Sequence, residues 1–109
     1  MEGTKAQYDE ALDSLIVYRE DRKNYASIKL GEIIVDLDKN YRISAVEIMN
    51  PDILFRIPKE KFSKISSASI QVQRRCTIFW IYLILEFEGI KEPQTLPVPL
   101  QLEHSVSLQ

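Results

Sequence analysis

Apolar and polar positions alternate with a period of two along most of this chain. The alternation is clearest over residues 32–38 and 41–49, which are separated by a short polar turn. A period of two places successive side chains on opposite faces of a strand, and strands this close in sequence pair antiparallel by default. The pattern therefore predicts a β-hairpin over residues 32–49.

Further segments with the same period indicate strands on both sides of this hairpin. They cover residues 14–19, 25–30, 67–75, 76–88 and 96–102. Pro97 and Pro99 cannot donate ladder hydrogen bonds, so the last segment is predicted to be an edge strand. Prolines and lysines interrupt the alternation at residues 51–65, where one or two short helices are expected. We therefore expect a mainly β fold, with α+β as the alternative, built as an antiparallel sheet of about six or seven strands.

Length and composition are those of one globular domain. The chain has 109 residues, of which 45% are hydrophobic and 28% are charged. That length suits about one domain, and a disordered chain would be less apolar. We expect residues 1–109 to form a single domain, with an amino-terminal hairpin region at 8–50 and antiparallel carboxy-terminal strands at 66–102.

The net charge, the cysteine content and the length of the apolar runs limit the binding partners and the cellular compartment expected for this protein. The net charge is −2, whereas proteins that bind nucleic acids usually carry a basic excess. The single cysteine, Cys76, cannot form an internal disulfide, which favours a reducing compartment. The apolar run at residues 77–87 is shorter than the roughly 20 residues of a membrane helix, and the opening segment MEGTKAQYDE does not resemble a signal peptide. We expect a cytoplasmic protein that binds neither nucleic acid nor membranes.

Residues that support catalysis are few. His104 is the only histidine and belongs to the carboxy-terminal tail, away from the predicted strands. Cys76 begins the most apolar predicted strand, where a buried and unreactive thiol is expected. The glycines are too far apart for a phosphate-binding loop. We therefore predict no catalytic residue, no cofactor and no enzymatic activity.

Three carboxylates are the candidates for a metal site. Asp36 and Asp38 share one face of a predicted strand, and Glu47 lies on the returning strand. If the three meet, they supply the oxygen ligands that Mg²⁺ or Ca²⁺ prefers. The alternative is structural: Asp38 then caps turn amides, and Glu47 pairs with a basic residue on a neighbouring strand.

The predicted strand at residues 76–88 has two apolar faces that both need cover. One face carries the predicted interface, Phe79, Ile81, Leu83, Leu85 and Phe87, and the other carries Ile78, Trp80, Tyr82 and Ile84. A small domain covers one face easily, so the other needs a second layer. Either the helical segment at 51–64 supplies that layer, or a second copy of the chain does. We expect the second copy, and hence a homodimer.

The first half of the chain resembles a known family. The resemblance rests on Tyr8, Asp9, Asp13 and Leu15, then on Gly31, Ile33, Ile34, Val35, Asp36 and Asp38, and then on Val46, Glu47, Ile48, Met49 and Asn50. In this order and spacing, residues 8–50 resemble domain-of-unknown-function family 2283, whose members are short prokaryotic proteins. The resemblance implies an uncharacterised prokaryotic protein, and it also implies an antitoxin-like role beside a small toxin-like neighbour.

Two positions depart from the family pattern. Tyr41 stands where the family often has a glycine after the acidic turn, and Ala45 replaces another glycine. Tyr41 at positive φ would cost about 1–2 kcal/mol. We therefore expect Asn40 to take the left-handed conformation and the turn to shift by one residue.

Three readings of function are compatible with these observations. The first is a non-enzymatic β-rich interaction module that self-associates, because apolar strand surface is abundant and catalytic residues are few. The second, implied by the resemblance alone, is an antitoxin-like regulatory partner of a small neighbouring protein. The third is a metal-binding protein that uses Asp36, Asp38 and Glu47.

Overall fold

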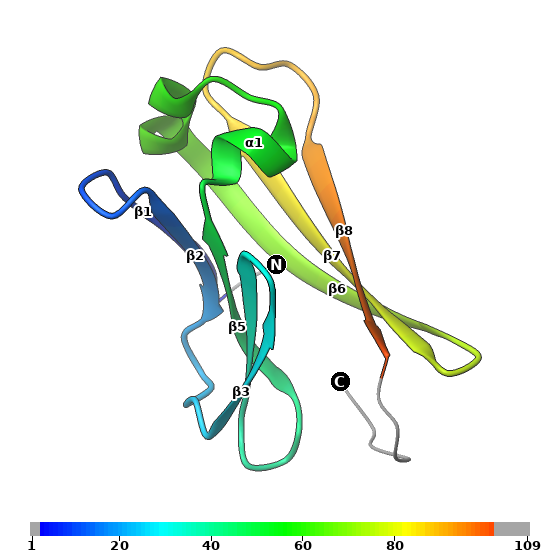
Figure 1. Ribbon diagram of the computed structural model, residues 1–109. Coiled ribbons are helices and arrows are strands. Elements are labelled where there is room, and N and C mark those ends of the chain that lie inside the picture. Colours follow the sequence, from blue (N-terminus) through cyan, green and yellow to red (C-terminus); the bar gives the residue numbers. More distant parts are fainter. Residues whose placement is uncertain (1–2, 102–109) are drawn as a thin grey trace.

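Two antiparallel β-sheets form the described part of the chain, residues 3–101 of a computed structural model (Figure 1). The first sheet has the strand order β1-β2-β5-β4-β3 and contains β1 (Thr4–Asp9), β2 (Ser14–Arg19), β3 (Ala26–Leu30), β4 (Ile33–Leu37) and β5 (Ile43–Met49). The second has the order β6-β7-β8 and contains β6 (Ile65–Arg75), β7 (Ile78–Phe87) and β8 (Gln94–Gln101). The expected mainly β, antiparallel fold is confirmed. Residues 3–101 hold eight strands, because the short segment before β2 forms a full strand of its own.

Strand β5 is the centre of the five-stranded sheet, where it pairs with β2 on one side and β4 on the other. Val46 lies opposite Val17 in β2 and opposite Val35 in β4, and all three are fully buried. Branched side chains of this kind pack well on a pleated surface that is half buried. The hairpin predicted over residues 32–49 is the pair β4–β5, which contains a bulge next to Asp36.

Two short helices connect the sheets at one end of the molecule, within the segment where the sequence predicts them (Figure 1). The α-helix α1 (Pro51–Phe55) has its proline in the first turn, where the missing amide leaves no hydrogen bond unmade. The helix is capped at its carboxyl end by Arg56, whose φ of 58° is left-handed. The 3₁₀-helix η1 (Lys59–Lys64) follows directly after Pro58.

Phe62 of η1 closes the core at this end and is only 2% exposed. Its ring lies 5.7 Å from that of Tyr8, 5.9 Å from that of Phe55 and 5.3 Å from that of Phe87, measured between centroids. Two of these contacts are edge-on, a favoured arrangement for aromatic pairs. One aromatic residue therefore joins β1, α1 and β7.

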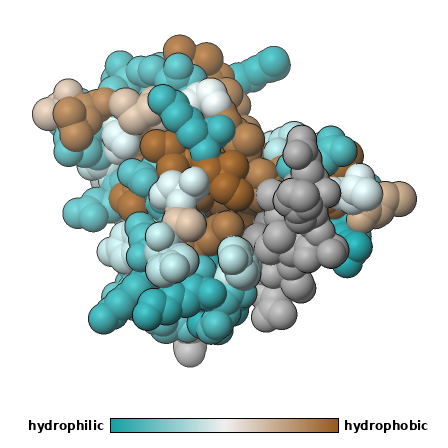
Figure 2. All heavy atoms as spheres, turned by 60° about the horizontal axis from the view of Figure 1, so that its bottom comes forward, coloured by the Kyte–Doolittle hydropathy of each residue, from teal (hydrophilic) through white to brown (hydrophobic). Residues whose placement is uncertain are grey.

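The core lies between the two sheets, and burial there contributes about 1.5–3 kcal/mol for each large apolar side chain. In a view turned toward the end opposite the helices, apolar residues gather in the middle of the visible face (Figure 2). The inner face of β7 supplies Phe79, Ile81, Leu83, Leu85 and Phe87 to this core, each at most 6% exposed.

The burial of these five side chains argues against the interface that the sequence predicted on them. They are already buried within one chain, which leaves them no surface for a second copy. The five-stranded sheet covers this face together with the helical segment, whose Phe62 packs against Phe87, so the second copy that the sequence suggested is not needed there. The side chains on the opposite face of β7 keep partial exposure, so that face is the available one.

The position of Cys76 also differs from expectation. Cys76 is exposed in the turn between β6 and β7, where its φ is 56°. The expectation of a buried thiol is wrong because the hairpin turn takes up residues 76 and 77, and β7 begins only at Ile78. His104 lies outside the described residues. Among residues 3–101, no helix has the length and apolar character to cross a membrane.

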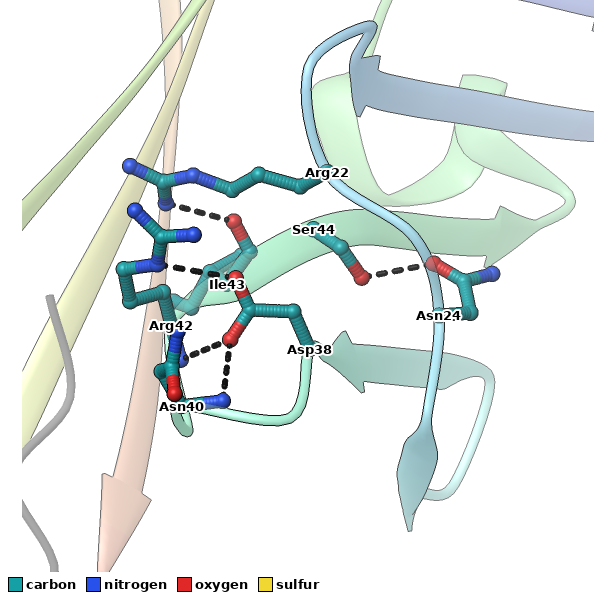
Figure 3. Close-up of polar contacts among 7 residues, drawn as sticks. All are labelled: Arg22, Asn24, Asp38, Asn40, Arg42, Ile43 and Ser44. Atoms are coloured by element: carbon teal, nitrogen blue, oxygen red, sulfur yellow. Dashed lines mark hydrogen bonds and ion pairs between the residues drawn. The ribbon is translucent and has the colours of Figure 1, made fainter.

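The loop between β2 and β3 crosses the end of the five-stranded sheet, because β5 and β4 lie between those two strands. Arg22 Nη1 in this loop donates to the Ile43 carbonyl oxygen at 2.9 Å. The hydroxyl of Ser44, which is 1% exposed, donates to Asn24 Oδ1 at 2.6 Å (Figure 3). These two bonds fix the loop to the start of β5.

Candidate functional site

Asp38 organises the turn between β4 and β5 (Figure 3). Its Oδ1 accepts hydrogen bonds from the backbone amides of Asn40 and Arg42, both at 2.9 Å, and its Oδ2 accepts one from Arg42 Nε at 2.8 Å. Burial raises the pKa of the carboxyl, but donation from Arg42 and Asn40 outweighs burial, so the pKa lies below its usual value. Asp38 therefore has the structural role of capping turn amides.

Tyr41, and not Asn40, is the left-handed residue of this turn, with a φ of 60°. The Tyr41 amide donates to the Asp38 carbonyl oxygen at 3.1 Å, and the Asp38 amide donates to the Arg42 carbonyl oxygen at 2.9 Å. A turn followed by one left-handed residue is a common three-residue hairpin loop. The expectation for Asn40 is wrong because the Asp38 carboxylate holds the amides on both sides of Tyr41. The turn keeps its register although a tyrosine occupies the usual glycine position.

Asp36 and Glu47 are neighbours on the outer face of the five-stranded sheet. Asp36 lies opposite Ala45, and Glu47 lies opposite Ile34, so the two carboxyl groups are diagonal neighbours across β4 and β5. Asp36 is only 2% exposed, and Ser27 donates a hydroxyl hydrogen bond to its Oδ1 at 2.6 Å. The structure therefore brings together two of the three predicted carboxylates.

The second oxygen of Asp36 is buried and has no hydrogen-bond donor among the described residues unless Glu47 carries a proton. A hydrogen bond with Asp36, burial and the Asp36 charge all raise the pKa of Glu47. A protonated Glu47 supplies the donor that Asp36 Oδ2 lacks, because two adjacent carboxyl groups resist double ionisation. The neighbour that shifts the pKa of Glu47 is thus a carboxylate, and not the basic residue that the sequence suggested.

A metal site built from all three predicted carboxylates is not formed. Asp38 is bound to Arg42 on the turn, whereas Asp36 and Glu47 face outward from the sheet. Within residues 3–101, no three histidine, cysteine, aspartate or glutamate side chains lie close enough to hold a metal ion.

Tyr8 and Asp13 form a second polar cluster, whose role the sequence did not reveal. The Tyr8 hydroxyl donates to Asp13 Oδ1 at 2.6 Å, and Lys59 Nζ lies 2.9 Å from Asp13 Oδ2. The hydrogen bond to Asp13 raises the pKa of Tyr8 to about 12, and the same bond and that of Lys59 lower the pKa of Asp13. The cluster ties the β1–β2 turn to η1. The sequence did indicate that Tyr8 and Asp13 lie on either side of the same turn, which was the one available sign of their contact.

The outer face of β7 carries a row of four apolar side chains, which we call the aromatic face. The row consists of Ile78, Trp80, Tyr82 and Ile84, and each of them is partly exposed. The rings of Trp80 and Tyr82 stack with their centroids 6.5 Å apart and their planes inclined by 21°. This row was recognised from the sequence, but the interface was assigned to the other side of the strand.

Most of the residues that flank the aromatic face on the two neighbouring strands are uncharged. The positions opposite its members are Arg75, Gln73, Gln71 and Ser69 in β6, and Gln101, Pro99, Pro97 and Thr95 in β8. Only Arg75, at the end of β6, is charged among these flanking positions. The middle of the face is thus an apolar row between glutamines and prolines.

Comparison with known proteins shows that the first half of the chain is similar to a family. Residues 5–50 cover nearly all of the five-stranded sheet, together with the Asp38 turn and the Asp36–Glu47 pair. They match Protein of unknown function (DUF2283). The resemblance seen over residues 8–50 is thereby confirmed. The DUF2283 match ends at Asn50, so the helices and the three-stranded sheet lie outside it.

Two curated relatives share part of their length with this chain. An uncharacterized protein of Methanocaldococcus jannaschii is 36% identical over 55 residues, which are 50% of this chain and 47% of the relative. A Methanosarcina mazei protein named putative hypoxanthine phosphoribosyltransferase is 31% identical over 70 residues, which are 64% of this chain and 57% of the relative. The chain spans about half the length of these relatives. No solved structure shows a significant match to the chain.

Proposed function

We propose that this protein is a non-enzymatic β-rich interaction module that self-associates through the aromatic face. The single observation that carries the proposal is this row of partly exposed apolar side chains, whose neighbours in β6 and β8 are uncharged except for Arg75 at one end. Tryptophan and tyrosine are enriched in the centres of protein interfaces, and charged residues are depleted there. The composition of the face therefore matches an interface centre.

The geometry of the sheet edges favours contact through the face. Pro97 and Pro99 in β8 have no amide hydrogen, so the free edge of β8 is poorly suited to accept another strand. At the other edge, β6 lies against β1 of the same chain. Face-to-face packing of two sheets needs no free backbone groups, since only side chains interdigitate.

Light scattering over a concentration series tests the proposal. The wild-type protein should be a dimer at micromolar concentrations, and Trp80→Lys or Tyr82→Thr should shift it to a monomer with an unchanged circular dichroism spectrum. Tyr25→Lys is the matched control, because Tyr25 is 66% exposed in a loop outside the aromatic face. A wild-type monomer throughout the series would contradict self-association.

The alternative is that a small neighbouring protein binds the aromatic face, as an antitoxin-like function would require. The support for this alternative is the DUF2283 match, and no described residue specifies such a partner. Purification from native extract distinguishes the two. A stoichiometric small protein that is lost with Trp80→Lys favours the alternative, whereas the chain alone at twice its mass favours self-association.

Cation binding at Asp36 and Glu47 is a second candidate function, favoured by the unpartnered Asp36 Oδ2. A hard cation such as Ca²⁺ or Mg²⁺ would satisfy this oxygen in place of a proton on Glu47. Thermal unfolding with and without each cation tests the idea at neutral pH. A rise in Tm that disappears in Glu47→Gln supports a cation, and an unchanged Tm favours the shared proton.

A further inference from the structure

We infer that two copies pack through the aromatic face in an antiparallel arrangement, with β7 of one copy running opposite to β7 of its partner. This inference rests on the proposed function and specifies how the two faces meet. A symmetric dimer contact uses the same patch on both copies, so the patch must complement itself. When the two sheets pack with their strands aligned, two arrangements satisfy that symmetry, with the two-fold axis either across the strands or along them.

The order of side chains in the aromatic face is compatible with an axis across the strands. Along β7 the row reads aliphatic, aromatic, aromatic, aliphatic, so it is unchanged in character when its direction is reversed. Reversal about the midpoint of the row places Ile78 opposite the partner's Ile84, and Trp80 opposite the partner's Tyr82. Each aromatic ring then meets a ring of the other copy, an arrangement that contributes beyond buried area.

The charges at the two ends of the face decide for the axis across the strands. Arg75 lies opposite Ile78 at one end, and Glu86, on the outward side of β7, lies opposite Ser67 toward the other end. Both side chains are exposed. Because an axis across the strands reverses their direction, it brings Arg75 toward the partner's Glu86 and the partner's Arg75 toward Glu86. Two attractive pairs then border an apolar centre, which is the usual anatomy of an interface.

An axis along the strands gives the opposite electrostatic result. It keeps the strand direction and therefore places Glu86 directly against the partner's Glu86, while both Arg75 side chains gather at one end. Like charges brought together across an interface oppose association. The three strands lie side by side (Figure 1), and the residues of β6 and β8 opposite the middle of the row are uncharged, so the charges that distinguish the two arrangements lie at its ends.

Charge reversal at the two ends distinguishes the arrangements. In Arg75→Glu and in Glu86→Arg, each attractive pair of the antiparallel dimer becomes a repulsive one. Each variant alone should weaken the dimer at least about tenfold in Kd by sedimentation equilibrium. An equimolar mixture of the two variants should dimerise again within a few-fold of the wild-type Kd, because opposite charges then meet at both ends.

The remaining outcomes separate this inference from the proposed function. If both single variants keep the wild-type Kd while Trp80→Lys still gives a monomer, the face is the interface but the antiparallel arrangement is wrong. If the mixture stays as weak as the single variants, the pairing of Arg75 with Glu86 is also wrong. If the wild-type protein is monomeric, both proposals fail. Glu32→Arg is the matched control, because this exposed glutamate precedes β4 in the other sheet.

Discussion

Tyr41 occupies a backbone conformation that suits glycine better than tyrosine. Its φ of 60° brings the Cβ atom close to the backbone, at a cost of about 1–2 kcal/mol. Tyr41→Gly should therefore stabilise the protein by about 0.5–1 kcal/mol, measured by urea unfolding, after the greater flexibility of an unfolded glycine is subtracted. Asn40→Gly should be neutral or slightly destabilising, because Asn40 does not have a positive φ. A larger gain from the Asn40 change would contradict this assignment of the turn.

Glu47 gives the stability of the protein an unusual dependence on pH. Because its pKa is raised in the folded state, its contribution is fully present below the ordinary value of 4.5 and is lost as pH rises through the folded pKa. Glu47→Gln keeps a donor for Asp36 and carries no charge. The variant should therefore gain stability relative to wild type as pH rises above 4.5, measured by urea unfolding at several pH values.

Asp13 and Asp38 change the stability of the protein with pH in the opposite direction to Glu47, so their contributions must be separated from it in that experiment. Their pKa values are lowered, so their contributions are present above the ordinary aspartate range and are lost as pH falls. Both groups are unchanged in Glu47→Gln and cancel in the difference from wild type. A difference that stays constant across the pH series would show that Asp36 and Glu47 do not share a proton.

At the scale of elements, the hydrogen bond within the β1–β2 hairpin contributes more to stability than the ion pair that links this hairpin to η1. Tyr8→Phe removes the hydroxyl that donates to Asp13 and should cost about 1 kcal/mol of unfolding free energy. Lys59→Met removes an exposed ion pair and should cost clearly less than the loss of this hydroxyl, because solvent screens exposed charges. Tyr25→Phe, at a tyrosine far more exposed, is the control for loss of a hydroxyl. Equal losses from Tyr8 and Lys59 would refute this ranking.

At the scale of the whole molecule, the two sheets depend on each other. Leu15 and Val17 in the five-stranded sheet are fully buried, and Arg19 Nη2 donates to the Ile70 carbonyl oxygen of the other sheet at 2.7 Å. A fragment of residues 1–50 would keep the DUF2283 segment but expose its inner face. We predict that this fragment aggregates or lacks cooperative unfolding, whereas the full chain unfolds in one transition by circular dichroism. A soluble, cooperatively folded fragment would show that the DUF2283 segment is a domain by itself.

The sequence by itself determined the local elements of this protein. Period-two alternation located the strands, and the prolines at 51 and 58 located the helical interruption, because both signals depend on neighbours along the chain. The family resemblance was also local, since it rests on the order and spacing of residues 8–50. The carboxylate pair was partly predictable for the same reason: Asp36 and Glu47 lie on adjacent strands of one hairpin.

Only the tertiary structure decided which faces are covered and which side chains meet. The sequence shows that both faces of β7 are apolar, but it does not show that a five-stranded sheet covers the face of Ile81 and leaves that of Trp80 partly exposed. The conformation of Tyr41 was likewise decided by the Asp38 carboxylate, which outweighs the intrinsic preference of tyrosine. In both cases contacts between separate elements, or a side chain bound to backbone amides, override preferences that can be read along the chain.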